Sequence, residues 1–256
     1  MKAAAFELAT PNSLAEASDL LAQPGARALA GGQSLGPMLN LRLVRPALLV
    51  RLSALPDLSG VEETADAVTI GACVTHAAIA DGRVPDLRGG ILAAIAQHIA
   101  YRAVRNRGTI GGSLCHADPA ADWPCTLTAL GAVALTADAD GGGRAIPLVQ
   151  FIVGAFRTML APGEILRAVR IPKPAENARW GYHKLCRKPG EFAHAMAAVL
   201  EDRGTRRIVI GATGGKPLLL AAAEDADAAL QSAGLDPIAR HMQIVALRRA
   251  LNRAAA

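Results

Sequence analysis

Two glycine-rich segments, about 80 residues apart, constrain the fold and function of this chain more than any other feature. Residues 30–35 read A-G-G-Q-S-L and residues 108–113 read G-T-I-G-G-S. Glycine tolerates positive φ and has no Cβ, so a glycine-rich turn at a strand end can expose backbone N–H groups to an anion such as phosphate. Neither segment has the G-x-G-x-x-G or Walker pattern, and a structural turn explains one Gly-Gly pair equally well. Two such segments are what a diphosphate held from two sides requires.

The composition is that of a folded protein with a substantial apolar core. Hydrophobic residues make up 52% of the 256 residues and charged residues 19%, which excludes a disordered chain. The length fits one large domain or two modest ones, since compact domains usually have about 100 to 200 residues. No apolar run approaches the ~18 residues of a membrane-spanning helix, and Glu7 interrupts the N-terminal apolar stretch before it reaches signal-peptide length. We therefore expect a cytoplasmic protein.

Cysteine spacing and charge exclude further classes of protein. The cysteines are widely spaced and form no C-x-x-C pair, so we expect buried free thiols rather than a zinc or iron–sulfur site. The net charge of +5 would suit nucleic acid, but aromatic residues make up only 3% of the chain, too few for base stacking. The densest basic group suits an anionic small ligand or an acidic partner surface equally well. The cysteines are Cys73, Cys115, Cys125 and Cys186, and the basic group is Arg102, Arg105 and Arg107.

Capping residues and apolar periodicity predict helices and strands in mixed order up to residue 171. Ser13, with Glu16 three residues later, forms a capping box for a helix over residues 13–21, and Thr75 caps a short helix over residues 75–80. Helical spacing predicts two longer helices, and short apolar runs bounded by Gly or Pro predict five strands. The helices are expected over residues 91–104 and 122–130, and the strands over residues 26–30, 47–52, 67–72, 132–136 and 165–171.

Residues 172–177, which begin Pro-Lys-Pro, mark the most convincing domain boundary. Beyond it, apolar patterning predicts three strands followed by two helices. The strands are expected over residues 180–185, 193–200 and 207–211, and the helices over residues 224–230 and 238–250. We therefore predict an α+β protein with one domain over residues 1–174 and a second over residues 175–256.

No arrangement of side chains predicts a catalytic nucleophile or a metal site. The sequence has neither a G-x-S-x-G elbow nor an H-E-x-x-H motif, and its six histidines form no ligand-spaced pair. His116 follows the second glycine segment and could line a ligand site without transferring a proton. Asp122 could accept hydrogen bonds from ligand hydroxyls or cap the helix that it begins, and spacing does not decide between these roles. Asp118 has the same two roles open, with capping favoured.

Three motifs together carry a resemblance to a known family. Residues 30–42 read A-G-G-Q-S-L-G-P-M-L-N-L-R, residues 109–124 read T-I-G-G-S-L-C-H-A-D-P-A-A-D-W-P, and Y-H-K-L at residues 182–185 is followed by Arg187 and by E-F-A at residues 191–193. They resemble the FAD-binding medium subunits of molybdenum hydroxylases, a group that includes carbon monoxide dehydrogenase and xanthine dehydrogenase. The resemblance covers nearly the whole chain.

This resemblance implies the two-subdomain FAD-binding fold of p-cresol methylhydroxylase and vanillyl-alcohol oxidase, with subdomains of about 1–55 and 56–174. A C-terminal domain with a three-stranded antiparallel sheet and helices would follow. The first glycine segment, with Thr109, Gly112 and Ser113, would hold the diphosphate of a noncovalently bound FAD. Asp122 would bind ribityl or ribose hydroxyls, and Leu160 would touch the cofactor. The residues of the first segment are Ala30, Gly31, Gly32, Gln33, Ser34 and Leu35; Ala100, Val104, Gly108, Cys115 and His116 would line the flavin or its chain, with Lys184 and Glu191 near it.

In such enzymes a molybdenum cofactor on a large subunit oxidises the substrate, and electrons cross two [2Fe-2S] clusters on a small subunit to reach FAD, which reduces an external acceptor. The resemblance thus implies an oxidoreductase subunit for electron transfer, in a heterotrimer or its dimer. Because the cofactor carries the chemistry, the missing acid–base dyad and metal ligands fit this role. Two alternatives stay open: a stand-alone flavin reductase of the same fold, and a nonredox nucleotide-binding module.

Overall fold

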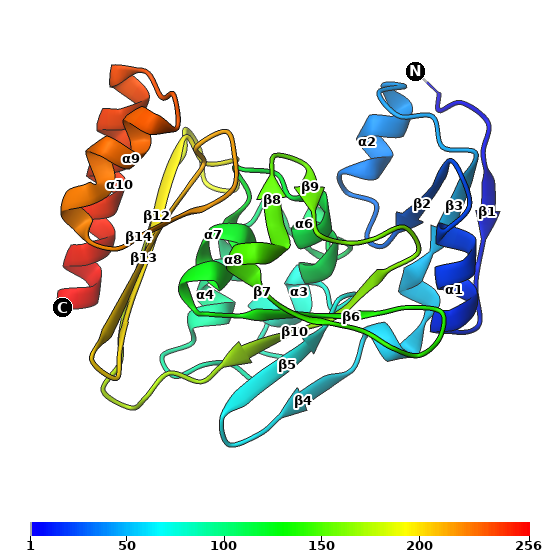
Figure 1. The fold of residues 1–256 in the computed structure, drawn as a ribbon, viewed down its shortest axis with the longest axis horizontal. Helices are drawn as coiled ribbons and strands as arrows, with labels where there is room; N and C mark the ends of the chain where they lie inside the picture. Colours follow the sequence, from blue (N-terminus) through cyan, green and yellow to red (C-terminus); the bar gives the residue numbers. More distant parts are fainter. Residues whose placement is uncertain (1) are drawn as a thin grey trace.

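The computed structural model describes residues 2–256, and its elements form three groups along the longest axis of the molecule (Figure 1). The first group is a parallel sheet in the order β1-β3-β2, formed by Glu7–Ala9, Leu48–Arg51 and Ala26–Leu29. Helix α1 (Leu14–Leu21) connects β1 to β2, and helix α2 (Leu35–Asn40) follows β2. Ser13 caps α1 as predicted, because its hydroxyl accepts from the N–H of Glu16 at 3.1 Å. The other half of the capping box is wrong, since the Glu16 carboxylate accepts from the N–H of Asn12.

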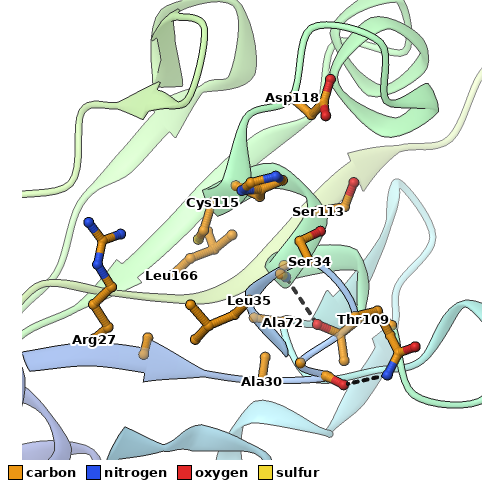
Figure 2. A pocket seen from close by; sticks show the side chains of 18 of the residues that line it. Arg27, Ala30, Ser34, Leu35, Ala72, Thr109, Ser113, Cys115, Asp118 and Leu166 are labelled. Atoms are coloured by element: carbon orange, nitrogen blue, oxygen red, sulfur yellow. Dashed lines mark hydrogen bonds between the residues drawn. The ribbon is translucent and has the colours of Figure 1, made fainter. Parts of the chain in front are cut away.

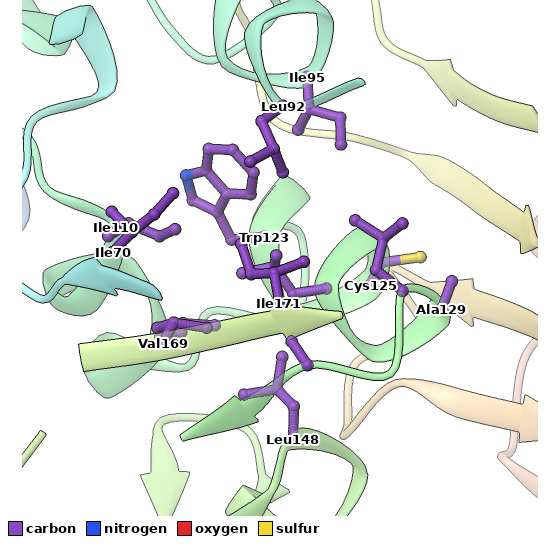
Figure 3. Packing of buried hydrophobic residues seen from close by; sticks show 14 of the residues in the cluster. Ile70, Leu92, Ile95, Ile110, Trp123, Cys125, Ala129, Leu148, Val169 and Ile171 are labelled. Carbon is purple, nitrogen blue, oxygen red and sulfur yellow. The ribbon is translucent and has the colours of Figure 1, made fainter. Parts of the chain in front are cut away.

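The central group is built on an antiparallel sheet in the order β4-β5-β10-β6-β7. Its helices gather on one side of this sheet in Figure 1, and their apolar residues fill the main core, where Trp123 is fully buried (Figure 3). Thr75 caps its helix as predicted. The strands are Val61–Glu63, Ala67–Gly71, Ile165–Pro172, Val133–Ala137 and Ala145–Pro147, with a small β8–β9 pair at Ile152–Gly154 and Arg157–Thr158. The helices are α3 (His76–Ala80), α4 (Ile91–Gln97), α5 (Arg102–Arg105), α6 (Ile110–His116), α7 (Asp122–Ala129) and α8 (Leu148–Phe151), with the 3-10 turns η1 (Leu52–Ala54) and η2 (Pro56–Leu58) preceding β4.

The C-terminal group is an antiparallel sheet in the order β11-β12-β13-β14, so the expected three strands are four. Successive side chains of a strand face opposite sides of a sheet, and β12 uses both sides. Met196 and Ala198 join the main core, whereas Ala197 and Val199 pack beneath α10 in a separate core. The strands are Arg179–Leu185, Ala195–Asp202, Thr205–Gly211 and Leu218–Leu220, and the helical elements are η3 (Ala223–Asp225), α9 (Ala226–Ser232) and α10 (Pro237–Ala255).

The predicted single helix over residues 91–104 is wrong, because the chain leaves helical geometry between α4 and α5. Ala100 has a φ of +46°, a left-handed conformation that a helix interior does not contain. The guanidinium of Arg105 donates to the carbonyls of Ile99 and Ala100 at 3.0 and 2.9 Å, and Ile99 forms a parallel bridge with Gly190. Tertiary contacts therefore fix the break. Across residues 2–256, none of the helices combines the length and the apolar character needed to cross a bilayer.

Candidate cofactor site

A cavity of about 1430 Å³ is lined by residues from all three groups of elements. This volume exceeds the roughly 300 to 1,000 Å³ of most small-molecule sites and suits a long ligand such as a dinucleotide. All of the predicted cofactor-binding residues line it. They are Ala30, Gly31, Gly32, Gln33, Ser34, Leu35, Ala100, Val104, Gly108, Thr109, Gly112, Ser113, Cys115, His116, Asp122, Leu160, Lys184 and Glu191.

The first glycine segment joins β2 to α2 and offers backbone donors. Gly32 has a φ of +70°, which turns the chain between strand and helix without the steric cost of a Cβ. The Gln33 side chain donates to the carbonyl of Gly31 at 3.1 Å. Among the hydrogen bonds within residues 2–256, none has the backbone N–H of Gly32, Gln33 or Ser34 as its donor. All three residues line the cavity, and consecutive N–H groups without a protein acceptor are the donors from which anion-binding nests are built.

The second glycine segment uses most of its backbone donors within the protein, unlike the first. Thr109 caps α6, and its hydroxyl accepts from the N–H of Gly112 at 3.0 Å. The N–H of Gly111 donates to Ala72 and that of Ser113 to the carbonyl of Thr109. The backbone donors of Gly111, Gly112 and Ser113 are therefore occupied, whereas within residues 2–256 the N–H of Thr109 has no protein acceptor. The segment presents the side chains of Thr109 and Ser113 to the cavity (Figure 2).

Glycines also let the two segments touch. A Cβ on Gly31 would lie 2.0 Å from the carbonyl oxygen of Arg107, and a Cβ on Gly112 would lie 3.6 Å from the Cβ of Ala30. Real Cβ atoms do not approach a carbonyl oxygen to 2.0 Å, so any other residue at position 31 would push the segments apart. The two glycine segments are thus in direct contact.

Asp122, which also lines the cavity, joins the central group to the C-terminal sheet. Its carboxylate accepts from the Lys184 ammonium at 3.0 and 3.1 Å and from the Tyr182 hydroxyl at 2.6 Å. Both side chains of the ion pair are more than nine-tenths buried. Burial, reinforced by the Asp122 charge, raises the pKa of Tyr182 well above its usual value, so the hydroxyl keeps its proton and donates.

These contacts decide the question left open for the two aspartates. Asp122 begins α7 but makes no capping hydrogen bond, so the capping role is wrong for it. Asp118 accepts from the N–H of Ala120 at 2.9 Å, which closes a turn before α7 rather than capping the helix. One acceptor position on Asp122 Oδ2 stays available for a ligand hydroxyl, since a carboxylate oxygen accepts two hydrogen bonds.

Aromatic and sulfur side chains also line the cavity. The rings of His116 and Phe156 lie 5.2 Å apart, and burial lowers the pKa of His116, with a smaller opposing effect from Asp118. His116 is therefore better suited to contact a ligand as a neutral ring than to carry charge. Cys115 is exposed on the cavity wall, so the expectation that all four thiols are buried is wrong.

Two members of the arginine group make contacts within the protein itself. Arg102 pairs with Asp81 at 2.6 Å, and Arg105 donates to the backbone beside Ala100. That backbone meets Gly190, where a Cβ would lie 2.7 Å from the Ala100 carbonyl oxygen. Arg105 thus supports the cavity end where Ala100, Gly190 and Glu191 converge.

The sequence did not predict the roles of Tyr182, His76 and Phe156 at the site. Tyr182 lies two positions from the predicted residue Lys184 on β11 and faces the same side, so strand periodicity could have linked the two. His76 lines the cavity and accepts a hydrogen bond from the indole N–H of Trp123, and Phe156 lies against His116. Nothing in the residue pattern marked either of these two.

Comparison with known proteins gives consistent matches over most of the chain. The family model described as the FAD binding domain in molybdopterin dehydrogenase matches residues 4–174. The nicotine 6-hydroxylase medium subunit of Paenarthrobacter nicotinovorans is 37% identical over 231 residues, covering 88% of this chain and 81% of that protein. The carbon monoxide dehydrogenase medium chain of Hydrogenophaga pseudoflava is 38% identical over 197 residues, covering 76% of this chain and 68% of that protein.

Solved structures agree with these relatives. Carbon monoxide dehydrogenase from Hydrogenophaga pseudoflava, in a form that lacks the molybdenum-pyranopterin moiety of its cofactor, superposes with a TM-score of 0.89 at 32% identity, covering 100% of this chain and 99% of the other. Quinoline 2-oxidoreductase from Pseudomonas putida 86 gives a TM-score of 0.86 at 34% identity, covering 100% and 98%.

Proposed function

Because this chain belongs to the family of FAD-binding domains of molybdopterin dehydrogenases, as its motifs predict, we propose that it carries FAD between an iron–sulfur partner and an external electron acceptor. The family membership makes it an oxidoreductase subunit with FAD as its cofactor. The observation that most supports electron transfer through this chain is a single long cavity that gathers every predicted cofactor-binding residue.

The residues present fit FAD. The free N–H groups of Gly32, Gln33 and Ser34 would bind the diphosphate, with the hydroxyls of Thr109 and Ser113 on its other side. No Cβ intrudes where the two segments meet, so the backbone can approach the phosphates closely. A carboxylate in place of these donors would repel the diphosphate, whereas N–H and O–H groups complement it.

At the flavin end, the chain supplies binding and orientation rather than acid–base chemistry. Asp122 would accept from a hydroxyl of the ribityl chain, and Lys184 and Tyr182 would hold its carboxylate in place. When bound, FAD supplies the two-electron to one-electron conversion that connects iron–sulfur clusters to an acceptor. Ala100, Val104, Leu160 and Glu191 would shape the surrounding wall and limit the entry of water.

The assembly that we propose follows the names of the relatives, which are medium subunits or chains of larger enzymes. In it, a large subunit with a molybdenum cofactor and a small subunit with two [2Fe-2S] clusters join this chain in the cytoplasm as a heterotrimer or its dimer. We also infer a p-cresol methylhydroxylase type of FAD-binding domain over residues 1–174 and a C-terminal domain over residues 175–256. The family match that ends at residue 174 supports this division.

The proposal is tested by the visible spectrum of the purified chain, expressed alone and with its genomic neighbours. Flavin bands near ~375 and ~450 nm, with FAD released on heating, are expected for the chain. Iron and molybdenum that copurify with it would support the subunit role, and a flavin-loaded chain that turns over a substrate without partners would support the stand-alone reductase. If the chain stays colourless with added FAD and coexpressed neighbours, only the alternative of a nonredox nucleotide-binding module remains.

A further inference from the structure

His76, which has no role in the function proposed above, sits beneath the second glycine segment. It is the first residue of α3, is only 5% exposed, and donates its backbone N–H to the carbonyl of Gly108 at 2.8 Å. Its ring packs directly against that glycine, because a Cβ on Gly108 would lie 2.9 Å from His76 Cδ2 and 3.1 Å from Nε2. The ring therefore forms part of the cavity wall next to Gly108.

A second contact fixes which ring nitrogen carries the proton. The indole N–H of Trp123 lies 3.1 Å from His76 Nδ1, and an indole N–H can only donate. Figure 3 shows this nitrogen on the side of the indole ring turned away from Leu92 and Ile95. Nδ1 must accept, so the neutral ring carries its proton on Nε2. Burial, with the nearby Arg105 charge, lowers the pKa of His76 to about 4, so the ring is neutral at neutral pH.

The Nε2–H group is left as a donor at the cavity. Nδ1 faces the buried indole, so the opposite edge of the ring, with Cδ2 and Nε2, faces Gly108 and the cavity. Within residues 2–256, no hydrogen bond involves His76 Nε2. Although the residue as a whole is only 5% exposed, Nε2 itself is not sealed off, so a ligand or water in the cavity can accept its hydrogen.

We propose that His76 is a positioning residue that donates its Nε2–H to an acceptor atom of the bound flavin cofactor, with Trp123 holding the ring in the required tautomer. The inference rests on the proposed function, since it requires FAD in the cavity. Like the backbone N–H groups of the nest at Gly32, this neutral donor with a fixed proton binds an acceptor equally well across the neutral pH range.

The test measures FAD affinity and the histidine tautomer in the same protein. Apoprotein would be titrated with FAD by fluorescence for the wild type, His76→Phe and His76→Gln. We expect His76→Phe to weaken binding about tenfold, the effect of one lost hydrogen bond, and His76→Gln, whose amide can donate from a similar place, to restore it to within about threefold. Equal Kd values for wild type and His76→Phe would overturn the proposal.

Nitrogen-15 NMR of labelled histidine supplies a readout that a purely structural role would not move. We expect the Nε2–H tautomer in the apoprotein, and a shift of the Nε2–H proton when FAD is added. An Nδ1–H tautomer, or an Nε2–H signal unchanged by bound FAD, would overturn the proposal and assign the donor to water. If His76→Phe fails to fold, the NMR spectra of the wild type and the FAD affinity of His76→Gln still test the proposal. Failure of the wild type to bind FAD would instead contradict the proposed function, a result that the wild-type titration identifies separately.

Discussion

The two glycine segments of this protein look alike in sequence and use their glycines for different purposes. In residues 30–35, positive φ at Gly32 leaves three consecutive N–H groups without protein acceptors. In residues 108–113, Gly111 and Gly112 donate to Ala72 and Thr109, and the missing side chains let backbone segments pack closely. The comparison shows that a Gly-Gly pair indicates a need for space or for positive φ, and only the hydrogen-bond partners decide which.

This difference predicts that substitutions will divide into two classes. Changes at Gly111, and at Gly31, whose Cβ would meet Arg107, should reduce the stability of the fold, whereas changes at Gly32 should reduce FAD affinity with a smaller effect on stability. If substitutions in both segments changed only stability, or only FAD affinity, the proposed difference between the segments would be wrong.

The largest effect is expected for Gly111→Val. A Cβ there would lie 2.4 Å from the Cβ of Ala72 and 2.7 Å from its carbonyl oxygen, so buried backbone must move. We expect a loss of about 3 kcal/mol or more in the free energy of unfolding, measured by urea denaturation. Gly36→Ala is the matched control, since a Cβ at Gly36 meets nothing within 4 Å and the residue lies in α2. Comparable losses in both variants would show that close packing is not what Gly111 provides.

Gly32→Asp should act on binding. A fixed carboxylate beside the diphosphate adds repulsion, so we expect FAD retention to be abolished and the Kd to rise at least about 100-fold, or about 2.7 kcal/mol. Gly32→Ala separates this charge effect from the strain of positive φ, which costs roughly 1 kcal/mol of stability. Gly112→Asp should lower the free energy of unfolding and lose flavin as a consequence, because its Cβ would lie 2.8 Å from Thr109 Oγ1 within the cap of α6. Unchanged flavin content in both aspartate variants would refute the two-segment site.

Low pH should reduce the stability of the fold around the second segment, because His76, whose ring packs on Gly108, becomes protonated. The folded pKa of about 4 lies below the ordinary value of 6.5, so the unfolded chain binds more protons between these values. Stability is therefore complete above pH 6.5 and falls as pH decreases toward 4, by about 3 kcal/mol at most. The free energy of unfolding of His76→Gln measured across this range should be flatter than that of the wild type. If the free energies of unfolding of the two proteins changed in parallel with pH, protonation of His76 would not be the cause of the loss of stability.

The smallest effect is expected outside both segments, at Arg102. Its exposed ion pair with Asp81 should contribute less than about 1 kcal/mol. Arg102→Ala should leave FAD affinity unchanged, as measured by the same fluorescence titration. A large loss of FAD affinity would show that the arginine group contributes to ligand binding. Separately, salt-sensitive DNA binding by the protein at submicromolar affinity would contradict the exclusion of a nucleic-acid ligand.

Local signals predicted much of the fold. Ser13 and Thr75 cap helices where expected, and the apolar runs around Ile70 and Val169 form neighbouring strands of the central sheet. The break at Ala100 and the fourth strand at Leu218–Leu220 were missed, because contacts with Arg105, Gly190 and β13 decide them rather than local propensity. The helix at Ile110–His116 was hidden by its glycines, which disfavour helix in isolation.

The candidate site was predicted less evenly. Family motifs located the cavity-lining residues, since those motifs follow the cofactor along the chain. They did not indicate that Asp122 pairs with Lys184 and Tyr182 across the junction with the C-terminal sheet, or that Trp123 orients His76. Such contacts join residues about 50 to 60 positions apart, and a single sequence carries no measure of that proximity.

The most direct test of the central claim is an amide NMR titration of the labelled apoprotein with FAD. If the first segment is the diphosphate nest, the N–H signals of Gly32, Gln33 and Ser34 should move strongly on binding, because they gain charged acceptors. Those of Gly111 and Gly112 should move little, since their protein acceptors are already in place. Large shifts at Gly111 and Gly112 with none at Gly32, Gln33 and Ser34 would contradict the account.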